Sequence, residues 1–332
     1  NTTLTLIAKD LADNETTLTR DVTIDLTAPN LVLSTPGDYL WFDTNIVTIS
    51  GTVSDLNFEK VTVDGVEIVV TNGSFSTSKD YTDGRQTVVV RAFDGAGNTS
   101  TVSRSFDVDT VVPILTLSAP TTDLVTNNSI VIFAGTVDEE NIESISVAGQ
   151  VVSTSSGPFQ YSIDLEEGVN SVTVLVTDKA GHQVSDVRSV TVDLTSPAVT
   201  VTQPIENDWL NTGTVLLEGT VSDANSTAVE VDGVAVTVSN GAFSTTLNLP
   251  DGPHSINVVA TDIAGNSTQL SRQFNIDTEP PVVSNLAPVD GSWTATSPVL
   301  VSGTVTDLSL TTLTVNGFEA TVDNNTFSVA VP

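Results

Sequence analysis

The sequence predicts an all-β fold, an elongated tandem array of small β-sandwiches with about seven strands each. Three observations predict it. The chain repeats itself every 84 residues, and each repeat is a series of short alternating segments separated by turn residues, without helical periodicity. The composition, with 39% hydrophobic and 15% charged residues, is too apolar for a disordered chain.

The repeat is defined by residue types that recur at one spacing. The positions that recur at 84-residue intervals are Asp25, Asp109, Asp193 and Asp277; Pro36, Pro120, Pro204 and Pro288; Gly51, Gly135, Gly219 and Gly303; Phe75, Phe159, Phe243 and Phe327. The linkers that follow the aspartates set the domain boundaries. We expect whole repeats at 29–112, 113–196 and 197–280, flanked by the C-terminal half of a repeat (1–28) and the N-terminal part of another (281–332).

Strands of the first whole repeat follow from alternation and turn signals. Apolar and polar residues alternate from Val47 to Val53, which is the period-2 pattern of a half-buried strand. Asp64-Gly65 is a two-residue hairpin signal, because glycine accepts a positive φ. The expected strands are Leu31–Ser34, Val47–Val53, Lys60–Val63, Val66–Val70, one that opens at Phe75, Thr87–Phe93 and Thr101–Val108. Seven such strands predict an immunoglobulin-like sandwich.

Charge and composition exclude several classes of protein. The formal net charge of −31 repels phosphate backbones and anionic lipids, so we expect no nucleic-acid partner. The absence of cysteine excludes disulfides and thiolate sites, and His182 and His254 are the only histidines. We therefore expect no enzyme activity. With no initiator methionine, signal peptide or long apolar run, we expect a mature or internal piece of a soluble chain, without membrane insertion.

Acidic residues recur at the ends of two strands and in each linker. Alternation places Asp55 and Asp94 at the ends of inward-facing apolar rows, and Asp25 of the linker enters at the same pole. The expected site residues of the other repeats are Asp109, Glu139 and Asp178; Asp193, Asp223 and Asp262; and Asp277 with Asp307, for which Asp10 is the equivalent third position.

Two interpretations of these carboxylates remain open. Three carboxylates repel each other unless a cation lies between them, and Ca²⁺ takes about six to eight oxygen ligands. Calcium would stiffen each junction. Alternatively, each aspartate accepts hydrogen bonds from loop N–H groups, as aspartate in tight turns commonly does. The neighbouring Asp138 and Glu140 make the second junction the most acidic and the best calcium candidate.

Two further residue types recur. Arginine stands at Arg20, Arg104, Arg188 and Arg272, on the inward face if alternation holds, where it needs a carboxylate or carbonyl partner. We favour a structural ion pair over a ligand contact. Tryptophan precedes the second long strand at Trp41, Trp209 and Trp293, where we favour closure of the core over stacking on sugar rings.

Several motifs carry a family resemblance. They are the proline-containing linkers, Ser-Gly-Thr-Val-Ser-Asp at 50–55, Val-Asp-Gly at 63–65 and Thr-Asp-x-Ala-Gly-Asn at 261–266. The chain resembles bacterial immunoglobulin-like tandem repeats, in particular the glucodextranase B-like domains of extracellular and surface proteins. It departs from the pattern at Asp13, where other copies have glycine, and at His182, where they have asparagine. The resemblance implies an extracellular or cell-surface, non-catalytic spacer, fibre or adhesin module.

The leading functional hypothesis is a structural segment of an extracellular fibre, stalk or filament. The constant repeat length favours it, because binding loops usually differ in length between copies. The alternatives are an adhesin or carbohydrate-binding module, with surface glycans or proteins as partners, and a spacer of a secreted polysaccharide-degrading enzyme. The two end segments form complementary halves of a repeat. They are completed either within a longer covalent array or head-to-tail by neighbouring copies of the chain.

Overall fold

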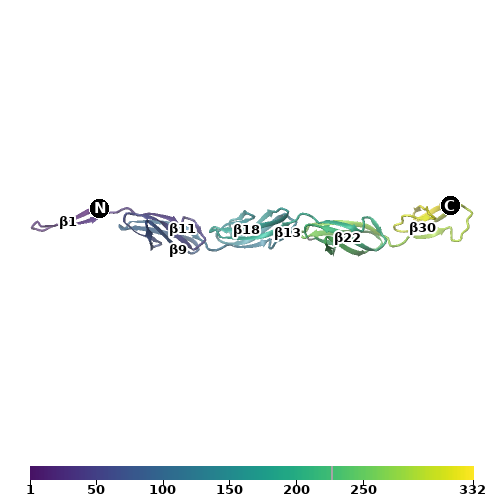
Figure 1. Cartoon of the computed structure of the whole chain (residues 1–332), viewed down its shortest axis with the longest axis horizontal. Coiled ribbons are helices and arrows are strands. Elements are labelled where there is room, and N and C mark those ends of the chain that lie inside the picture. The colour runs from purple at the N-terminus through teal and green to yellow at the C-terminus, as the bar shows by residue number, and fades with distance from the viewer. Residues whose placement is uncertain (226) are drawn as a thin grey trace. The chain divides into compact units, whose positions relative to one another are not determined.

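The computed structural model describes residues 1–225 and 227–332, and every regular element within them is a β-strand (Figure 1). The predicted all-β class of tandem immunoglobulin-like repeats is therefore confirmed. No helix in the described chain is long and apolar enough to cross a membrane. The chain falls into two compact units, residues 1–122, 132–162 and 171–188 in one and residues 123–131, 163–170 and 189–332 in the other.

Strand bounds follow the 84-residue repeat. Before and within the first whole repeat lie β1 (Thr2–Lys9), β2 (Glu15–Val22), β3 (Asn30–Thr35), β4 (Trp41–Phe42), β5 (Ile46–Ser54), β6 (Phe58–Val63), β7 (Val66–Ile68), β8 (Val70–Thr71), β9 (Ser74–Asp80), β10 (Gly84–Asp94) and β11 (Thr99–Val108). Residues 113–196 contain β12 (Ile114–Ala119), β13 (Leu124–Thr126), β14 (Ile130–Asp138), β15 (Ile142–Val147), β16 (Gln150–Ser153), β17 (Gly157–Asp164), β18 (Gly168–Asp178) and β19 (Gln183–Val192).

The remaining strands complete the series. Residues 197–280 contain β20 (Ala198–Gln203), β21 (Asp208–Leu210), β22 (Thr214–Ser222), β23 (Thr227–Val231), β24 (Val234–Val236), β25 (Val238–Ser239), β26 (Ala242–Asn248), β27 (Gly252–Asp262) and β28 (Ser267–Ile276). Residues 281–332 contain β29 (Val282–Ala287), β30 (Val299–Thr306), β31 (Thr314–Val315), β32 (Phe318–Glu319), β33 (Val322–Asp323) and β34 (Thr326–Val331).

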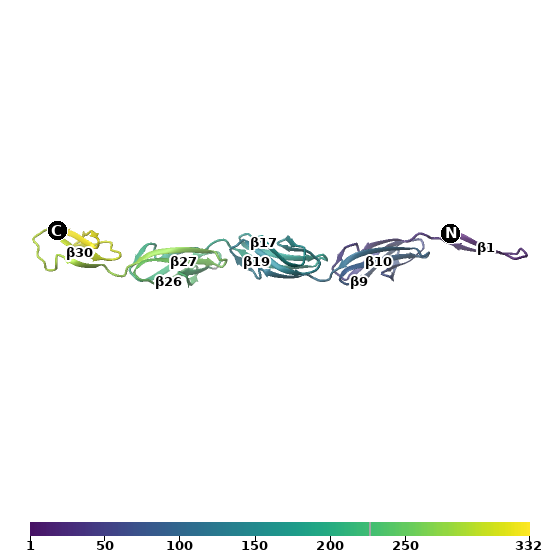
Figure 2. The same ribbon diagram turned by 180° about the vertical axis from the view of Figure 1, so that it is seen from behind.

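Two sheets make up each complete sandwich. In the first whole repeat, one sheet has the order β3-β5-β9-β8 and the other the order β4-β11-β10-β6-β7. In residues 197–280 the orders are β20-β22-β26-β25 and β21-β28-β27-β23-β24, with β26 and β27 labelled in Figure 2. The four-stranded sheets are antiparallel, and the five-stranded sheets are antiparallel except that β4 and β21 run parallel to β11 and β28. Two packed sheets of this kind are typical of the immunoglobulin-like sandwich.

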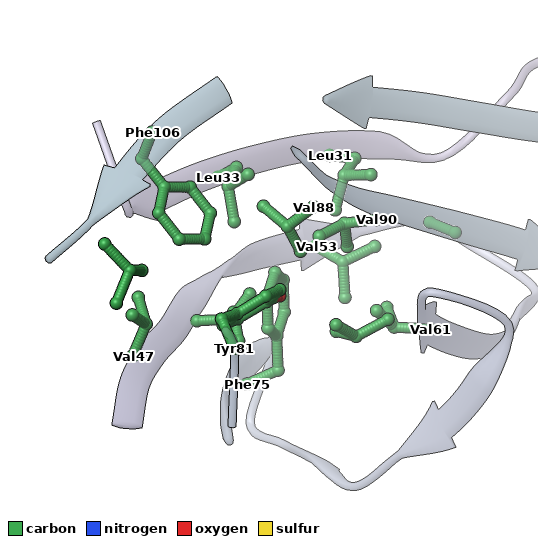
Figure 3. Close-up of a cluster of buried hydrophobic side chains, with 14 residues drawn as sticks. Leu31, Leu33, Val47, Val53, Val61, Phe75, Tyr81, Val88, Val90 and Phe106 are labelled. Carbon is green, nitrogen blue, oxygen red and sulfur yellow. The ribbon is translucent and has the colours of Figure 1, made fainter. Parts of the chain in front are cut away.

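The core lies between the two sheets. Figure 3 shows Val47 and Phe75 of one sheet facing Val88, Val90 and Phe106 of the other. Because side chains alternate along a strand, each sheet supplies every second residue to this layer. The expected alternation from Val47 to Val53 is observed in β5, since Val47, Ile49, Gly51 and Val53 are buried and the residues between them are mostly exposed.

A close contact explains why glycine and phenylalanine keep the repeat spacing. Gly51 pairs across the sheet with Phe75, and a Cβ at Gly51 would lie 2.6 Å from the Phe75 ring and 2.1 Å from the Val32 carbonyl oxygen. The equivalent pair Gly219–Phe243 is equally tight, at 2.3 Å. The ring therefore fits only where its cross-strand neighbour has no side chain.

The structure refines the predicted strands. The first whole repeat has nine strands rather than seven, because the two-residue β4 was missed and Val66–Val70 is divided. β7 pairs with β6 in one sheet, whereas β8 pairs with β9 in the other, so Val69 marks the change of sheet. The Asp64-Gly65 hairpin is present, with φ of 46° and 83°.

Candidate metal centre

The structure brings nine of the predicted carboxylates together in three groups. Within each group, one oxygen from each residue lies within 4.8 Å of the others. The three groups, called triads below, are Asp25, Asp55 and Asp94; Asp109, Glu139 and Asp178; and Asp193, Asp223 and Asp262. Asp277 and Asp307 belong to no triad among the residues that the structure describes. Asp10 is the residue at the equivalent of their third position.

Three different parts of the chain supply each triad. In the first, Asp25 follows β2 in the linker, Asp55 follows β5, and Asp94 is the last residue of β10. A bulge in β6 opposite Asp94 shifts the strand register, because Phe93 pairs with Lys60 and Asp94 with Phe58. The two strand-end carboxylates therefore come from opposite sheets and meet the linker carboxylate at one end of the sandwich.

One oxygen of each carboxylate caps a local turn. Asp25 Oδ1 accepts the Thr27 N–H at 2.9 Å, and Asp55 Oδ1 accepts the Asn57 N–H at 2.9 Å. Asp94 Oδ1 accepts the N–H groups of Ala96 and Asn98, at 2.9 and 2.8 Å. The turn-capping hydrogen bonds considered from the sequence are thus present. They occupy one oxygen of Asp25 and one oxygen of Asp55.

These hydrogen bonds set the ionisation of the strand-end residues. Burial disfavours the charged form of Asp94, but hydrogen bonds from the Asn98 side chain and from nearby N–H groups hold its pKa below the usual value. The pKa of Asp262 is lowered by the same balance, with Asn266 as the side-chain donor. Both carboxylates therefore stay negatively charged near neutral pH.

Burial differs between the triads. All three members of the second triad are buried, whereas Asp25, Asp55 and Asp223 are half-buried. Buried carboxylates are costly unless they are paired. Among the described residues, the one basic side chain at salt-bridge distance from a triad is His182, whose Nδ1 lies 2.8 Å from Asp178 Oδ2. His182 thus takes the place of Asn98 as the donor to its strand-end aspartate.

The sequence prediction missed a polar side chain at each junction. Asn141 Nδ2 donates to Asp109 Oδ2 at 3.1 Å, and Ser309 Oγ donates to Asp277 Oδ2 at 2.6 Å. Asn57 bridges Asp25 and Asp55 when its amide nitrogen points inward. These residues follow the second carboxylate by two positions at the repeat spacing, and that regularity could have identified them.

Side-chain amides tie two of the linkers to the repeats that follow them. Asn98 Nδ2 donates to the Asp25 carbonyl at 3.2 Å, and Asn266 Nδ2 donates to the Asp193 carbonyl at 2.8 Å. The glycine before these asparagines has a positive φ, and Asp13 keeps that conformation with a φ of 63°. The exchange of glycine for aspartate at position 13 therefore leaves the turn intact.

The recurring arginines have structural partners. Arg104 Nη1 lies 3.2 Å from Asp38 Oδ2, and Arg272 Nη1 lies 3.0 Å from Glu206 Oε2. Arg188 donates to the Pro120 carbonyl at 3.2 Å. These side chains are half-buried at the edge of the sandwich rather than in its core. In the incomplete N-terminal segment, Arg20 is exposed.

The tryptophan prediction was wrong. In the part of the chain that the structure describes, no tryptophan is among the buried hydrophobic residues, and Trp209 and Trp293 are 47% and 100% exposed. Trp41 is half-buried and lies under the Lys179 ammonium, 5.6 Å from the ring centre. The tryptophan loop lies beside the sandwich edge, where β4 and β21 pair with the last strand and leave the ring outside.

Comparison with known proteins identifies the repeat. The family described as "Glucodextranase, domain B" matches residues 29–110, 113–194 and 197–278. Bacillopeptidase F of Bacillus subtilis (strain 168) is 32% identical over 187 residues, which are 55% of this chain and 13% of that protein. The PII-type proteinase of Lacticaseibacillus paracasei is 26% identical over 312 residues, 85% of this chain and 16% of that protein.

Solved structures with similarity to the chain are tandem-domain proteins. A tetra-tandem repeat from the extending region of a large adhesion protein has 27% sequence identity and a TM-score of 0.36, covering 83% of this chain and 81% of that one. The titin I-band fragment I67–I69 has 13% identity and a TM-score of 0.47, covering 76% of this chain and 99% of that one.

Proposed function

This chain belongs to the glucodextranase domain B family, and on that premise we propose that it is a non-catalytic extracellular spacer whose repeat junctions bind calcium. It spans 13% and 16% of the two proteinases that it matches, so it corresponds to an accessory part of much larger proteins. A spacer needs a constant unit and stiff connections. The uniform 84-residue repeat supplies the constant unit.

The observation that carries the proposal is the recurrence of the triads. Each one joins a linker carboxylate to two carboxylates of the following repeat, with oxygens within 4.8 Å of one another. A cation held there bonds to the linker and to both sheets at once, which restricts rotation about the linker. Hard oxygen ligands of this kind suit Ca²⁺ or Mg²⁺ rather than softer metals.

Side-chain amides beside the carboxylates supply further oxygens. Asn57 either donates its amide nitrogen to Asp25 and Asp55 or turns its amide oxygen toward them. With the oxygen inward, the carboxylate and amide oxygens converge without a donor between them, which is the arrangement that a cation stabilises. The same rotation is available to Asn141 beside Asp109. We therefore assign these asparagines as additional ligands.

Thermal unfolding in calcium and in chelator tests the proposal. Because ligand binding to the folded state alone adds about 2.7 kcal/mol at a hundredfold excess over Kd, calcium should raise the Tm by several degrees. Magnesium and ionic-strength-matched NaCl separate specific binding from screening.

A matched pair of variants tests whether the calcium-induced rise in Tm comes from the triads. Asp109→Asn removes one triad charge and should reduce the calcium-induced rise in Tm. Asp80→Asn removes the same charge from an exposed position outside the triads and should leave that rise unchanged. Equal Tm values in calcium and chelator for the unmodified chain would rule out the calcium junctions.

The exposure of Trp209 favours carbohydrate binding as a second candidate function. Its ring is 47% exposed although its repeat is complete, so one face can stack on a sugar. Glycan-array binding that Trp209→Ala abolishes would support this role. Binding that survives the substitution would exclude the ring as the contact.

A further inference from the structure

A lysine–tryptophan contact joins the first and second whole repeats beside the second triad. The Lys179 ammonium lies over the Trp41 ring, 5.6 Å from its centre. Trp41 is the first residue of β4 in the first whole repeat, whereas Lys179 lies in the turn after β18 of the second. Among aromatic side chains, tryptophan attracts a cation most strongly. The contact therefore joins the two repeats at a point outside the linker.

The backbone at both ends of this contact leads directly to a triad carboxylate. Trp41 precedes Phe42, whose carbonyl oxygen accepts the Asp109 N–H at 2.9 Å. Lys179 directly follows Asp178. Asp109 and Asp178 are both members of the second triad. A contact that fixes the tryptophan against the lysine thus also fixes the separation of these two carboxylates.

The turn that carries Lys179 is itself held firmly within the second repeat. The Lys179 N–H donates to the Asn141 carbonyl at 2.9 Å. Asp178 Oδ1 accepts the N–H groups of Gly181 and His182 at 2.7 and 2.8 Å. On the other side of the contact, β4 is held by its pairing with β11. The two side chains therefore connect backbone segments that are each fixed in their own repeat.

The same backbone arrangement occurs at the junction of the second and third whole repeats. The Thr126 carbonyl accepts the N–H of the linker residue Asp193 at 2.9 Å. Asn127 Nδ2 lies 3.6 Å from the place of a Cβ at Gly265, in the turn after β27. The residues at the positions of the tryptophan and the lysine are Val125 and Ile263. The meeting of this segment with this turn is common to both junctions, whereas the cation and the indole ring belong to the first.

We propose that the Trp41–Lys179 contact holds Asp109 and Asp178 at the separation that a bound calcium ion requires, so that Lys179 is a positioning residue of the second triad. The inference rests on the proposed calcium function. A lysine beside carboxylates acts through its charge as well, and that charge repels a bound cation. Loss of the charge alone would strengthen calcium binding, whereas loss of the positioning contact weakens it. The direction of the change therefore separates the two roles.

Calcium titration of the 332-residue chain tests the positioning role. Asp55→Asn and Asp223→Asn remove one ligand each from the first and third triads, so that calorimetry reports the second. In this background, Lys179→Ala should weaken calcium binding about 2–5-fold, the equivalent of one exposed cation–π contact. Lys179→Arg keeps a cation over the ring and should preserve the affinity. Lys60→Ala, which removes a cation–π pair with Phe93 inside one repeat, should not weaken binding. Unchanged or tighter binding in Lys179→Ala overturns the proposal.

Fluorescence in chelator separates failure of the contact from failure of the calcium function. In a chain that retains only Trp41, through Trp209→Phe and Trp293→Phe, acrylamide quenching reports how far the lysine covers the ring. Lys179→Ala should increase the quenching, whereas Lys60→Ala should not. Equal quenching in all three chains overturns the contact. Increased quenching in Lys179→Ala, together with no calcium binding by the unmodified chain, supports the contact and overturns both the calcium function and the positioning role.

Discussion

Individual aspartates carry two tasks at the repeat junctions. Asp94 uses one oxygen to cap a turn and presents the other toward Asn98 and the triad. Because its pKa is lowered on folding, ionised Asp94 stabilises the fold above the unfolded-state pKa of about 4, and this contribution is lost as the pH falls through the lower folded-state value.

Asp94→Asn should lower the Tm at neutral pH, since an amide nitrogen would replace an acceptor that faces Asn98. The deficit relative to the unmodified chain should begin to shrink below the unfolded-state pKa of about 4 and disappear only below the lower folded-state pKa, where the carboxylate is protonated in both states. Thermal melts across the acidic range measure it, with Asp80→Asn as the control. A deficit that does not change with pH would contradict the ionisation argument.

Gly51 is constrained by packing rather than by its φ. A Cβ there would collide with a backbone oxygen, which has no other rotamer to adopt. We expect Gly51→Ala to destabilise the repeat by about 1–3 kcal/mol, as overpacking of a core commonly does. Denaturant unfolding measures the loss. Thr52→Ala, on the exposed side of the same strand, is the control and should change little.

At the scale of elements, a charged clamp holds the loop between β3 and β4 against β11. Asp38 accepts the Ser105 N–H at 3.1 Å and pairs with Arg104 at 3.2 Å. Asp38→Ala should remove both contacts and cost about 1 kcal/mol, a value discounted because the carboxylate is largely exposed. Faster hydrogen exchange at the Ser105 amide would report the loosened loop, and unchanged exchange would show that the clamp is dispensable.

Long strands were predictable because apolar and polar residues alternate along their sequence. β5 and β10 follow that pattern and were predicted to within a few residues. β4 was not predictable, since its two residues become a strand only by pairing with β11, which is distant in sequence. The exposure of the tryptophan rings was not predictable for the same reason, because it depends on the side of the pairing with the last strand on which the ring lies.

Proximity of the carboxylates was predictable from repetition, whereas their partners were not. Strand-end positions on inward-facing rows have to approach the linker at one pole, so Asp55 and Asp94 could be placed near Asp25. The bridging role of Asn57 depends on side-chain geometry within a turn. Sequence order shows that Asn57 recurs, but not that its amide lies between two carboxylates.

At the scale of the whole molecule, the net charge of −31 opposes compaction through self-repulsion. Screening by about 0.5 M NaCl should therefore raise the Tm modestly, because it shortens the range of repulsion between surface charges. Calorimetry at low and high salt in chelator measures this effect. A Tm that falls with salt would show that favourable surface pairs outweigh the repulsion.

The shortest strand has a consequence for mechanical strength. Pulling on the two linkers of a repeat loads β3 at one end and β11 at the other, and β4 runs parallel to β11 between them. Three backbone hydrogen bonds join β4 and the residues just before it to β11. Their donors are the N–H groups of Tyr39, Asp107 and Asp109, at 2.6, 2.9 and 2.9 Å from the acceptor oxygens. Opposed tension along parallel strands shears these bonds together instead of peeling them one by one. The hydrogen bonds of the two-residue β4 thus bear the force that is applied to its sandwich.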